Sequence, residues 1–300
     1  MRWAGTMLSR SRAGVRTTLL WKLSVGLSTM GLVVGTQVCA QDLLVAAASD
    51  LAPTIPQLTR QLKESKGLAI RVSVGSSGQL ARQIEQGAPF DLFLSADEDF
   101  VAQLVKAGKG DAATVQIYAT GRLAIWSKTG SVKRLEDLAR PEVKRITIAN
   151  PALAPYGRLA KAALQKAGLW ERVDGKLVLA ESVRQTMQFA ETGNVDAALT
   201  SWTLVHDKGG IQLSDSIRQA GVVVKGSAKA TEALAVLAYL RGSEGRQILG
   251  AHGLLPGSPA GEPLLQDLKK DDGNGKGGGT DEQPKKTESL RPAKKRNKNK

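Results

Sequence analysis

Apolar segments alternate with amphipathic segments between Leu43 and Val105, and this alternation restricts the fold more than any other feature of the chain. The apolar runs have the length of β-strands and cover residues 43–48, 68–74 and 90–95. The amphipathic runs have apolar residues at helical spacing and cover residues 53–64, 79–85 and 97–105. The order β-α-β-α-β-α favours a parallel sheet with crossover helices.

A second set of the same kind follows. It comprises strands at 145–149, 176–179 and 195–200 and helices at 158–167 and 182–191. A strand at 118–126 leads into this set, a strand at 221–225 leads back, and residues 230–249 are expected to form helices that pack on the first set. We therefore predict an α/β fold of two lobes, each a mainly parallel sheet with helices on both faces, and a ligand cleft between them. Lobe 1 is expected to comprise residues 41–120 and 225–265, and lobe 2 residues 121–224.

Two of the predicted strands run through serine into a helix start. Residues 72–85 form a strand, a Gly/Ser turn with Ser76 and Ser77, and a helix, and Leu43 to Ala52 repeats this plan with Ser49. Free N–H groups and hydroxyls at the positive end of a helix dipole can cradle an anion. Each serine is also an ordinary N-cap by itself. The second lobe contributes two further helix starts, at 150–157 and at Ser182. Each of them is either part of an anion site or an ordinary helix cap.

The first forty residues have the pattern of a secretory signal. Five basic residues precede an apolar run at 23–34, and Ala40 ends a small-residue cleavage site. We expect cleavage after Ala40 and export to the periplasm, because the run is short for a membrane span. A retained N-terminal anchor and a lipid anchor at Cys39 are the alternatives.

The other end of the chain, residues 266–300, is rich in Gly, Lys, Asn and Pro and is expected to be a disordered tail. It has 11 basic and 6 acidic residues, and the signal has five basic residues, so about +4 of the formal charge of +14 belongs to residues 41–265. Most of the excess positive charge therefore lies in the two ends of the chain. It gives no indication that the folded part binds nucleic acid. The tail is expected to be a solvated extension, with anionic lipid, cell wall or polyanions as alternative contacts.

Cysteine and histidine are scarce. If cleavage follows Ala40, the single cysteine, Cys39, is removed, and disulfides and thiolate sites are excluded. His206 and His252 are the only histidines. A histidine metal cluster is therefore not expected, and a Ser-His-Asp triad would need one of these two residues.

Four segments resemble the periplasmic molybdate-binding proteins of molybdate ABC importers, which have the type II periplasmic binding protein fold. They are residues 46–54, 75–97, 150–168 and 181–200, and the block LARQIEQGAPFDLFLSAD is the most specific of them. The resemblance runs in order from about Asp42 to Leu255. It implies capture of molybdate or tungstate in the cleft, without a cofactor, and delivery by a monomer to a membrane permease driven by an ATPase.

The resemblance also implies which residues bind the oxyanion. Ser49 and Ser77 would supply hydroxyl and amide donors, and Tyr156 and Val183 would supply backbone N–H groups. Ser201 stands where a well-known member of the family has a tyrosine hydroxyl donor. All of these groups bind oxygen atoms, so molybdenum is held only as the oxyanion and no residue is expected to ligate a metal ion.

A site made only of donors suits a fully ionised oxyanion. A phosphate that keeps its proton would point a donor at donors, and sulfate would have to be rejected by cavity size. Asp50 is the residue that would change this, because a carboxylate facing the cleft accepts a proton. We expect Asp50 in the first helical turn, facing water.

Other functions are open to this sequence. Within the binding-protein class, sulfate or another small anion is an alternative ligand. A serine hydrolase would use Ser77 or Ser201 with one of the histidines, although neither serine lies in a Gly-x-Ser-x-Gly motif. A ligand-sensing transcription regulator would need a DNA-binding module, and the export signal argues against it.

Overall fold

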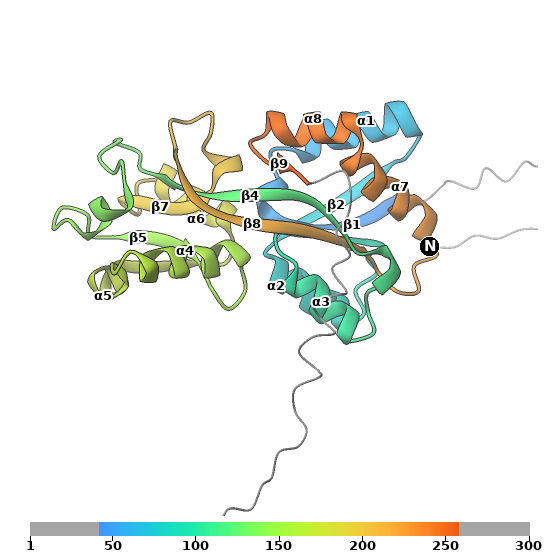
Figure 1. Cartoon of the computed structure of the whole chain (residues 1–300), viewed down its shortest axis with the longest axis horizontal. Helices are drawn as coiled ribbons and strands as arrows, with labels where there is room; N and C mark the ends of the chain where they lie inside the picture. The colour runs from blue at the N-terminus through green and yellow to red at the C-terminus, as the bar shows by residue number, and fades with distance from the viewer. Residues whose placement is uncertain (1–41, 258–300) are drawn as a thin grey trace, which may run out of the picture. The chain divides into compact units, whose positions relative to one another are not determined.

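The computed structural model describes residues 42–257 (Figure 1). The strands are β1 (Leu43–Ala48), β2 (Ile70–Gly75), β3 (Leu92–Ser95), β4 (Gln116–Trp126), β5 (Ile146–Ala149), β6 (Leu177–Ala180), β7 (Ala197–Ser201), β8 (Ile211–Val223) and β9 (Leu255–Pro256). The α-helices are α1 (Ile55–Lys66), α2 (Ser77–Glu85), α3 (Asp99–Lys106), α4 (Pro155–Lys166), α5 (Trp170–Val173), α6 (Val183–Glu191), α7 (Ala230–Arg241) and α8 (Ser243–Ala251). Short 3₁₀ turns are η1 (Ser49–Leu51), η2 (Ala112–Thr114), η3 (Leu135–Ala139), η4 (Asp174–Lys176) and η5 (Trp202–Leu204).

The strands form one mixed sheet in the order β2-β1-β3-β8-β4-β7-β5-β6, with β9 beside β4. At one end β1 is parallel to β2 and β3, and at the other β5 is parallel to β6 and β7. The long strands β4 and β8 pair antiparallel with each other and connect the two parallel parts (Figure 1). We call β1–β3 with η1, α1–α3, α7 and α8 the first group, and β5–β7 with α4–α6 and the loops between them the second group.

The first group has helices on both faces of its strands. On β1, Val45 and Ala47 pack in one core with α1, α7 and α8, whereas Ala46 packs in another with α2 and α3. β3 alternates in the same way, with Leu92 and Leu94 in the first of these cores and Phe93 in the second. This is the period of two that a strand buried on both faces requires. Figure 1 shows α1 and α8 on one side of these strands and α2 and α3 on the other.

The second group has a large core of its own. Ile146 and Ile148 of β5 pack with Leu164 of α4 and Met187 of α6. Ala48 of the first group also belongs to this core. The two groups are therefore in contact where β1 ends, immediately before Ser49.

The predicted alternation of strands and helices is confirmed in both groups, and residues 230–249 form α7 and α8, separated at Gly242. The return strand is longer than predicted, because β8 begins at Ile211 rather than near Gly221. Its first eight residues alternate between half-buried and exposed. Such a pattern is typical of a strand with one face in water, and the run IQLSDSIR contains this signal.

Among the described residues no helix is long and apolar enough to cross a membrane. The predicted signal at 1–40, the anchor alternatives including Cys39, and the tail at 266–300 lie outside the described residues.

Candidate ligand-binding site

Four of the residues predicted to bind the ligand lie at the starts of helical segments. Ser49 is the first residue of η1, Ser77 of α2 and Val183 of α6, and Tyr156 is the second residue of α4. The fifth, Ser201, is the last residue of β7. All five are at most 5% exposed to solvent, so a ligand bound by them would be enclosed.

The backbone at three of these starts keeps unused donors. The first N–H groups of a helix have no acceptor within the helix. The amides of Ser77, Tyr156 and Val183 also have no acceptor elsewhere among residues 42–257. Sequence explains two of these starts, because Ser182 caps α6 by accepting from Gln185 N and Pro155 opens α4 at a position where no donor is needed.

The two hydroxyls of the first group are also available as donors. Ser77 Oγ accepts from the amide of Ala96 at 3.0 Å, and this bond leaves the hydroxyl hydrogen free for another acceptor. Ser49 Oγ makes no hydrogen bond within residues 42–257, and it is not one of the fully buried oxygens that lack a partner there. Both residues are at most 5% exposed, and both hydroxyl hydrogens are available to a ligand.

These helix starts meet where the two groups touch. At the start of α2, Gly78 N donates to the carbonyl of Leu153, 2.8 Å away in the loop before α4. A Cβ atom at Gly78 would lie 2.6 Å from that oxygen, so the close approach requires glycine. The turn η1, which holds Ser49, contacts both α6 and η5. The structure thus brings the starts of η1, α2, α4 and α6 to the boundary between the groups.

Ser201 is brought to the same boundary, with its side chain already engaged. Its hydroxyl lies 2.9 Å from Thr203 Oγ1 and accepts from Thr203 N at 3.3 Å. Whether Ser201 also contacts a ligand stays a prediction. The phenol of Tyr156 is hydrogen-bonded to Asp50 and Gln219.

The expectation that Asp50 faces water is wrong. Asp50 is fully buried in η1, and its Oδ2 accepts from Tyr156 Oη at 3.1 Å and from Gln219 Nε2 at 2.5 Å. The physical reason is that η1, in the first group, packs against α6 and η5, so its three residues are all buried and none of them faces water. The exclusion of a protonated phosphate, which assumed Asp50 outside the cleft, no longer follows.

Burial dominates the electrostatics of Asp50. It raises the pKa of this carboxyl from 3.8 to about 6, against the opposing effect of the hydrogen bonds from Gln219 and Tyr156. Burial also raises the pKa of the Tyr156 phenol well above its ordinary value, so Tyr156 remains a neutral donor. The second carboxylate oxygen, Oδ1, is buried without a partner among the described residues.

The hydrogen bonds of Asp50 continue into β4 and β8. We call the joined residues Asp50, Tyr118, Tyr156, Thr203 and Gln219 the Asp50 cluster. Tyr118 Oη donates to Gln219 Oε1 at 2.9 Å, and Thr203 Oγ1 donates to the carbonyl of Asp50 at 2.7 Å. Gly121 leaves room for the cluster, since a Cβ atom there would lie 1.9 Å from Tyr156 Oη. Sequence reasoning missed Tyr118, Gln219 and Gly121 because no local pattern connects residues so far apart.

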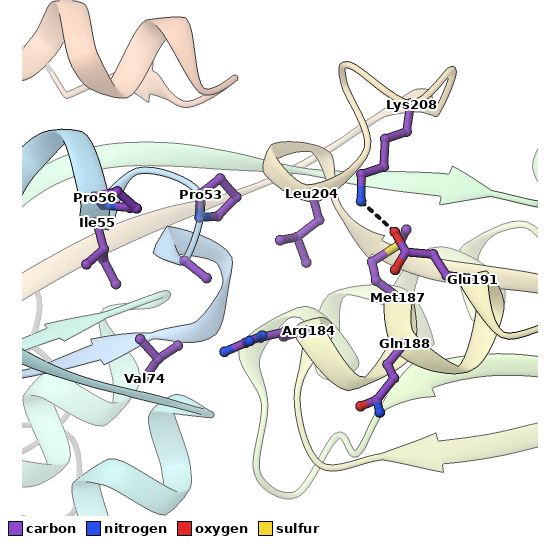
Figure 2. Close-up of a pocket in the computed structure, with 11 residues that line it drawn as sticks. Pro53, Ile55, Pro56, Val74, Arg184, Met187, Gln188, Glu191, Leu204 and Lys208 are labelled. Atoms are coloured by element: carbon purple, nitrogen blue, oxygen red, sulfur yellow. Dashed lines mark hydrogen bonds and ion pairs between the residues drawn. The ribbon is translucent and has the colours of Figure 1, made fainter.

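A groove of about 590 Å³ lies next to this cluster (Figure 2). Its lining comes from both groups and consists of Ala52, Pro53, Ile55, Pro56, Val74, Arg184, Met187, Gln188, Glu191, Leu204 and Lys208. None of the five predicted ligand residues lines it, although Arg184 directly follows Val183. Figure 2 shows the Arg184 side chain extending toward Val74 and the ion pair between Lys208 and Glu191. The groove borders the buried donors without containing them.

The two histidines have hydrogen-bond partners away from Ser77 and Ser201. His206 Nδ1 lies 3.2 Å from the carbonyl of Thr203, and His252 Nε2 lies 3.2 Å from Gln57 Oε1. Neither histidine is hydrogen-bonded to Ser77 or Ser201 in the described part of the chain. Between residues 42 and 257 no group of three or more His, Cys, Asp or Glu side chains is arranged to hold a metal ion.

Comparison with known proteins gives one consistent result. Residues 43–255 match the family model described as bacterial extracellular solute-binding protein. The chain is 30% identical over 243 residues to the molybdate-binding protein of Rhodobacter capsulatus, which covers 77% of this chain and 96% of the relative. It is 32% identical over 226 residues to that of Azotobacter vinelandii, with 71% and 90% covered. The solved periplasmic molybdate-binding protein of Azotobacter vinelandii superposes with a TM-score of 0.68 at 28% identity, over 72% of this chain and all of that one.

Proposed function

The chain belongs to the bacterial extracellular solute-binding proteins, and from that premise we propose that it binds molybdate or tungstate and delivers it to an ABC importer. The ligand is inferred from the relatives that the chain spans almost entirely, both of which are named as molybdate-binding proteins. Ser49, Ser77, Tyr156 and Val183 would bind the oxyanion, with Ser201 as a further candidate.

The observation that carries the proposal is the set of buried, uncharged donors at the boundary between the groups. The amides of Ser77, Tyr156 and Val183 and the hydroxyls of Ser49 and Ser77 have hydrogens to donate and no acceptor for them within residues 42–257. Arg158, a cation at the start of α4, is paired with Asp97 instead. Donors of this kind form charge-assisted hydrogen bonds to an oxyanion without adding a fixed charge.

These donors come from two parts that can separate. We take residues 41–120 and 225–265 as one lobe and residues 121–224 as the other, with β4 and β8 as the strands between them. Opening at these strands would part Gly78 from Leu153 and Asp50 from Tyr156, because each of these contacts joins the two groups. Ligand bound by donors of both lobes would then favour the closed arrangement.

Location and partners follow from the same family. We place the protein in the periplasm, exported by residues 1–40, where it would act as a monomer that presents its closed form to a membrane permease. No cofactor or nucleic acid enters this scheme. Sulfate or another small anion is the alternative ligand, and it would occupy the same donors, so the distinction must come from the size of the enclosed space.

The function is tested by thermal unfolding of the protein with molybdate, tungstate or sulfate at pH 7. A ligand at 100 times its dissociation constant stabilises the folded state by about 2.7 kcal/mol. For a chain of this size the melting temperature should rise by roughly 5–11 °C. We expect this rise with molybdate and tungstate and a smaller one with sulfate. No rise with any oxyanion would contradict the proposal, and a rise with sulfate alone would favour the alternative ligand.

A further inference from the structure

The two carboxylate oxygens of Asp50 have different surroundings. Oδ2 accepts hydrogen bonds from Tyr156 and Gln219, whereas Oδ1 is buried and has no partner among the residues that the structure describes. A buried polar atom without a partner is costly, and it is costly in either protonation state. As an ionised oxygen Oδ1 has no donor, and as a hydroxyl it has no acceptor. Asp50 directly follows Ser49, and its Oδ2 accepts from the phenol of Tyr156, so two of the residues proposed to bind the oxyanion adjoin this side chain.

Within residues 42–257, no cation is among the groups that shift the pKa of Asp50. The titratable groups that interact with it are the phenols of Tyr156 and Tyr118, from α4 and β4. The β8 and η5 neighbours, Gln219 and Thr203, are neutral. Of the cations on the elements next to η1, Arg184 lines the groove and Arg71 pairs with Asp42. Asp50 takes part in none of the ion pairs between described residues.

An ionised Asp50 next to a bound dianion would place like charges together in a dry environment. The repulsion is removed if a single proton lies between the carboxylate and the ligand. That proton also gives Oδ1 the partner that it lacks. We propose that Asp50 Oδ1 and one oxygen of the bound oxyanion share a proton, so that the dianion binds together with one H⁺ from solution; this rests on the function proposed above.

The pKa of Asp50, about 6 in this structure, fixes the direction and range of the effect. Above that value the free protein is ionised and must take up a proton on binding. The affinity then falls as the pH rises, by up to about tenfold per pH unit. Below that value the proton is already present, and the affinity levels off.

The test is a calorimetric titration of the protein with sodium molybdate at pH 6.0 and pH 8.0. We expect the dissociation constant to increase by about 50-fold between the two, because Asp50 is already half-protonated at pH 6.0. At pH 8.0 the binding enthalpy should vary with the ionisation enthalpy of the buffer, with a slope of one proton taken up. An unchanged dissociation constant and a slope of zero, with molybdate still bound, would overturn the inference and leave the proposed function intact.

The variant Asp50→Asn tests whether Asp50 is the group that takes up the proton when the ligand binds. The amide oxygen of Asn can accept from Tyr156 and Gln219 while its N–H₂ donates toward the ligand, so no proton is needed. We expect the variant to bind molybdate with less than about a threefold change in dissociation constant between the two pH values. Glu98→Gln is the control, because Glu98 is another partly buried acid but pairs with Arg218, and it should keep the pH dependence. If Asp50→Asn keeps the pH dependence as well, Asp50 is not the residue.

The two proposals fail in different ways. Absence of molybdate binding by the unchanged protein at both pH values would refute the proposed function and the inference with it. The buffer dependence is measured on the unchanged protein, so it decides the inference even if Asp50→Asn does not fold.

Discussion

The phenolic oxygen of Tyr156 lies 3.1 Å from Asp50 Oδ2, and this hydrogen bond joins residues that are 106 positions apart, one in each group. It is accompanied by Thr203 Oγ1 on the carbonyl of Asp50 and by Gly78 N on that of Leu153. The two groups are therefore connected by buried hydrogen bonds at the place where the predicted ligand residues lie. A change in these bonds should affect both stability and binding.

Gly121→Ala, in β4, should displace side chains that are hydrogen-bonded to Asp50. The new Cβ would lie 1.9 Å from Tyr156 Oη and 2.7 Å from Gln219 Nε2, so both side chains must move. Overpacking and the weakened hydrogen bonds should lower the free energy of unfolding by about 2–4 kcal/mol. Urea unfolding measures this loss. Gly250→Ala is the control, since nothing lies within 4 Å of its Cβ position and alanine favours a helix by about 0.5–1 kcal/mol. Equal effects of the two changes would contradict the account.

The raised pKa of Asp50 should make the free protein less stable as the pH rises. Between the ordinary value of 3.8 and the folded value of about 6, the folded state binds more protons than the unfolded state. The stability that this group provides is complete below about 3.8 and is lost as the pH rises through about 6, a loss of about 3 kcal/mol at pH 7. Asp50→Asn should therefore be more stable than the unchanged protein at pH 7 and similar to it at pH 4, by urea unfolding.

The contribution of Asp196 to the free energy of unfolding should depend on pH in the opposite direction to that of Asp50. The backbone N–H groups of Arg145 and Lys144, each 2.8 Å from its carboxylate, lower the pKa of Asp196. Its contribution is present above the ordinary pKa and is lost as the pH falls through the lowered value. Asp196→Asn should be less stable than the unchanged protein at pH 7. A gain in stability for both variants would show that the effect is not specific to burial of Asp50.

Val183→Pro isolates one backbone donor. Val183 is the first residue of α6, where proline is well tolerated, and Ser182 before it is already extended with ψ of 164°. The change therefore removes the amide hydrogen with little effect on the helix. Loss of one hydrogen bond to an oxyanion should weaken molybdate binding by about 10- to 100-fold. Val183→Ala keeps the amide and removes only the packing of the two methyl groups, so calorimetry should find a much smaller effect. Equal weakening by the two variants would exclude Val183 N as a ligand donor.

The fold was accessible to sequence reasoning where the signal is local. Apolar periodicity predicts the strands and helices from Leu43 to Val105, and Ser182 and Pro155 mark the starts of α6 and α4. These patterns depend on residues a few positions apart. The start of β8 at Ile211 was missed, although its polar alternation is visible in the sequence.

The Asp50 cluster was not accessible in this way. The partners of Asp50, Tyr156 and Gln219, lie 106 and 169 residues away, so no periodicity or cap connects them. The rule that acids favour the first helical turn applies to exposed turns, and η1 is buried on all sides. Tertiary contacts decide the environment of such a residue.

The most direct measurement is a crystal structure of the protein with sodium molybdate, with anomalous diffraction recorded at the molybdenum edge. The account predicts one strong anomalous peak at the boundary between the groups. Its oxygens should lie within about 3 Å of Ser49 Oγ, Ser77 Oγ and the amides of Tyr156 and Val183. A peak elsewhere, for example beside Arg184 in the groove, or no ordered molybdenum at all, would contradict the account.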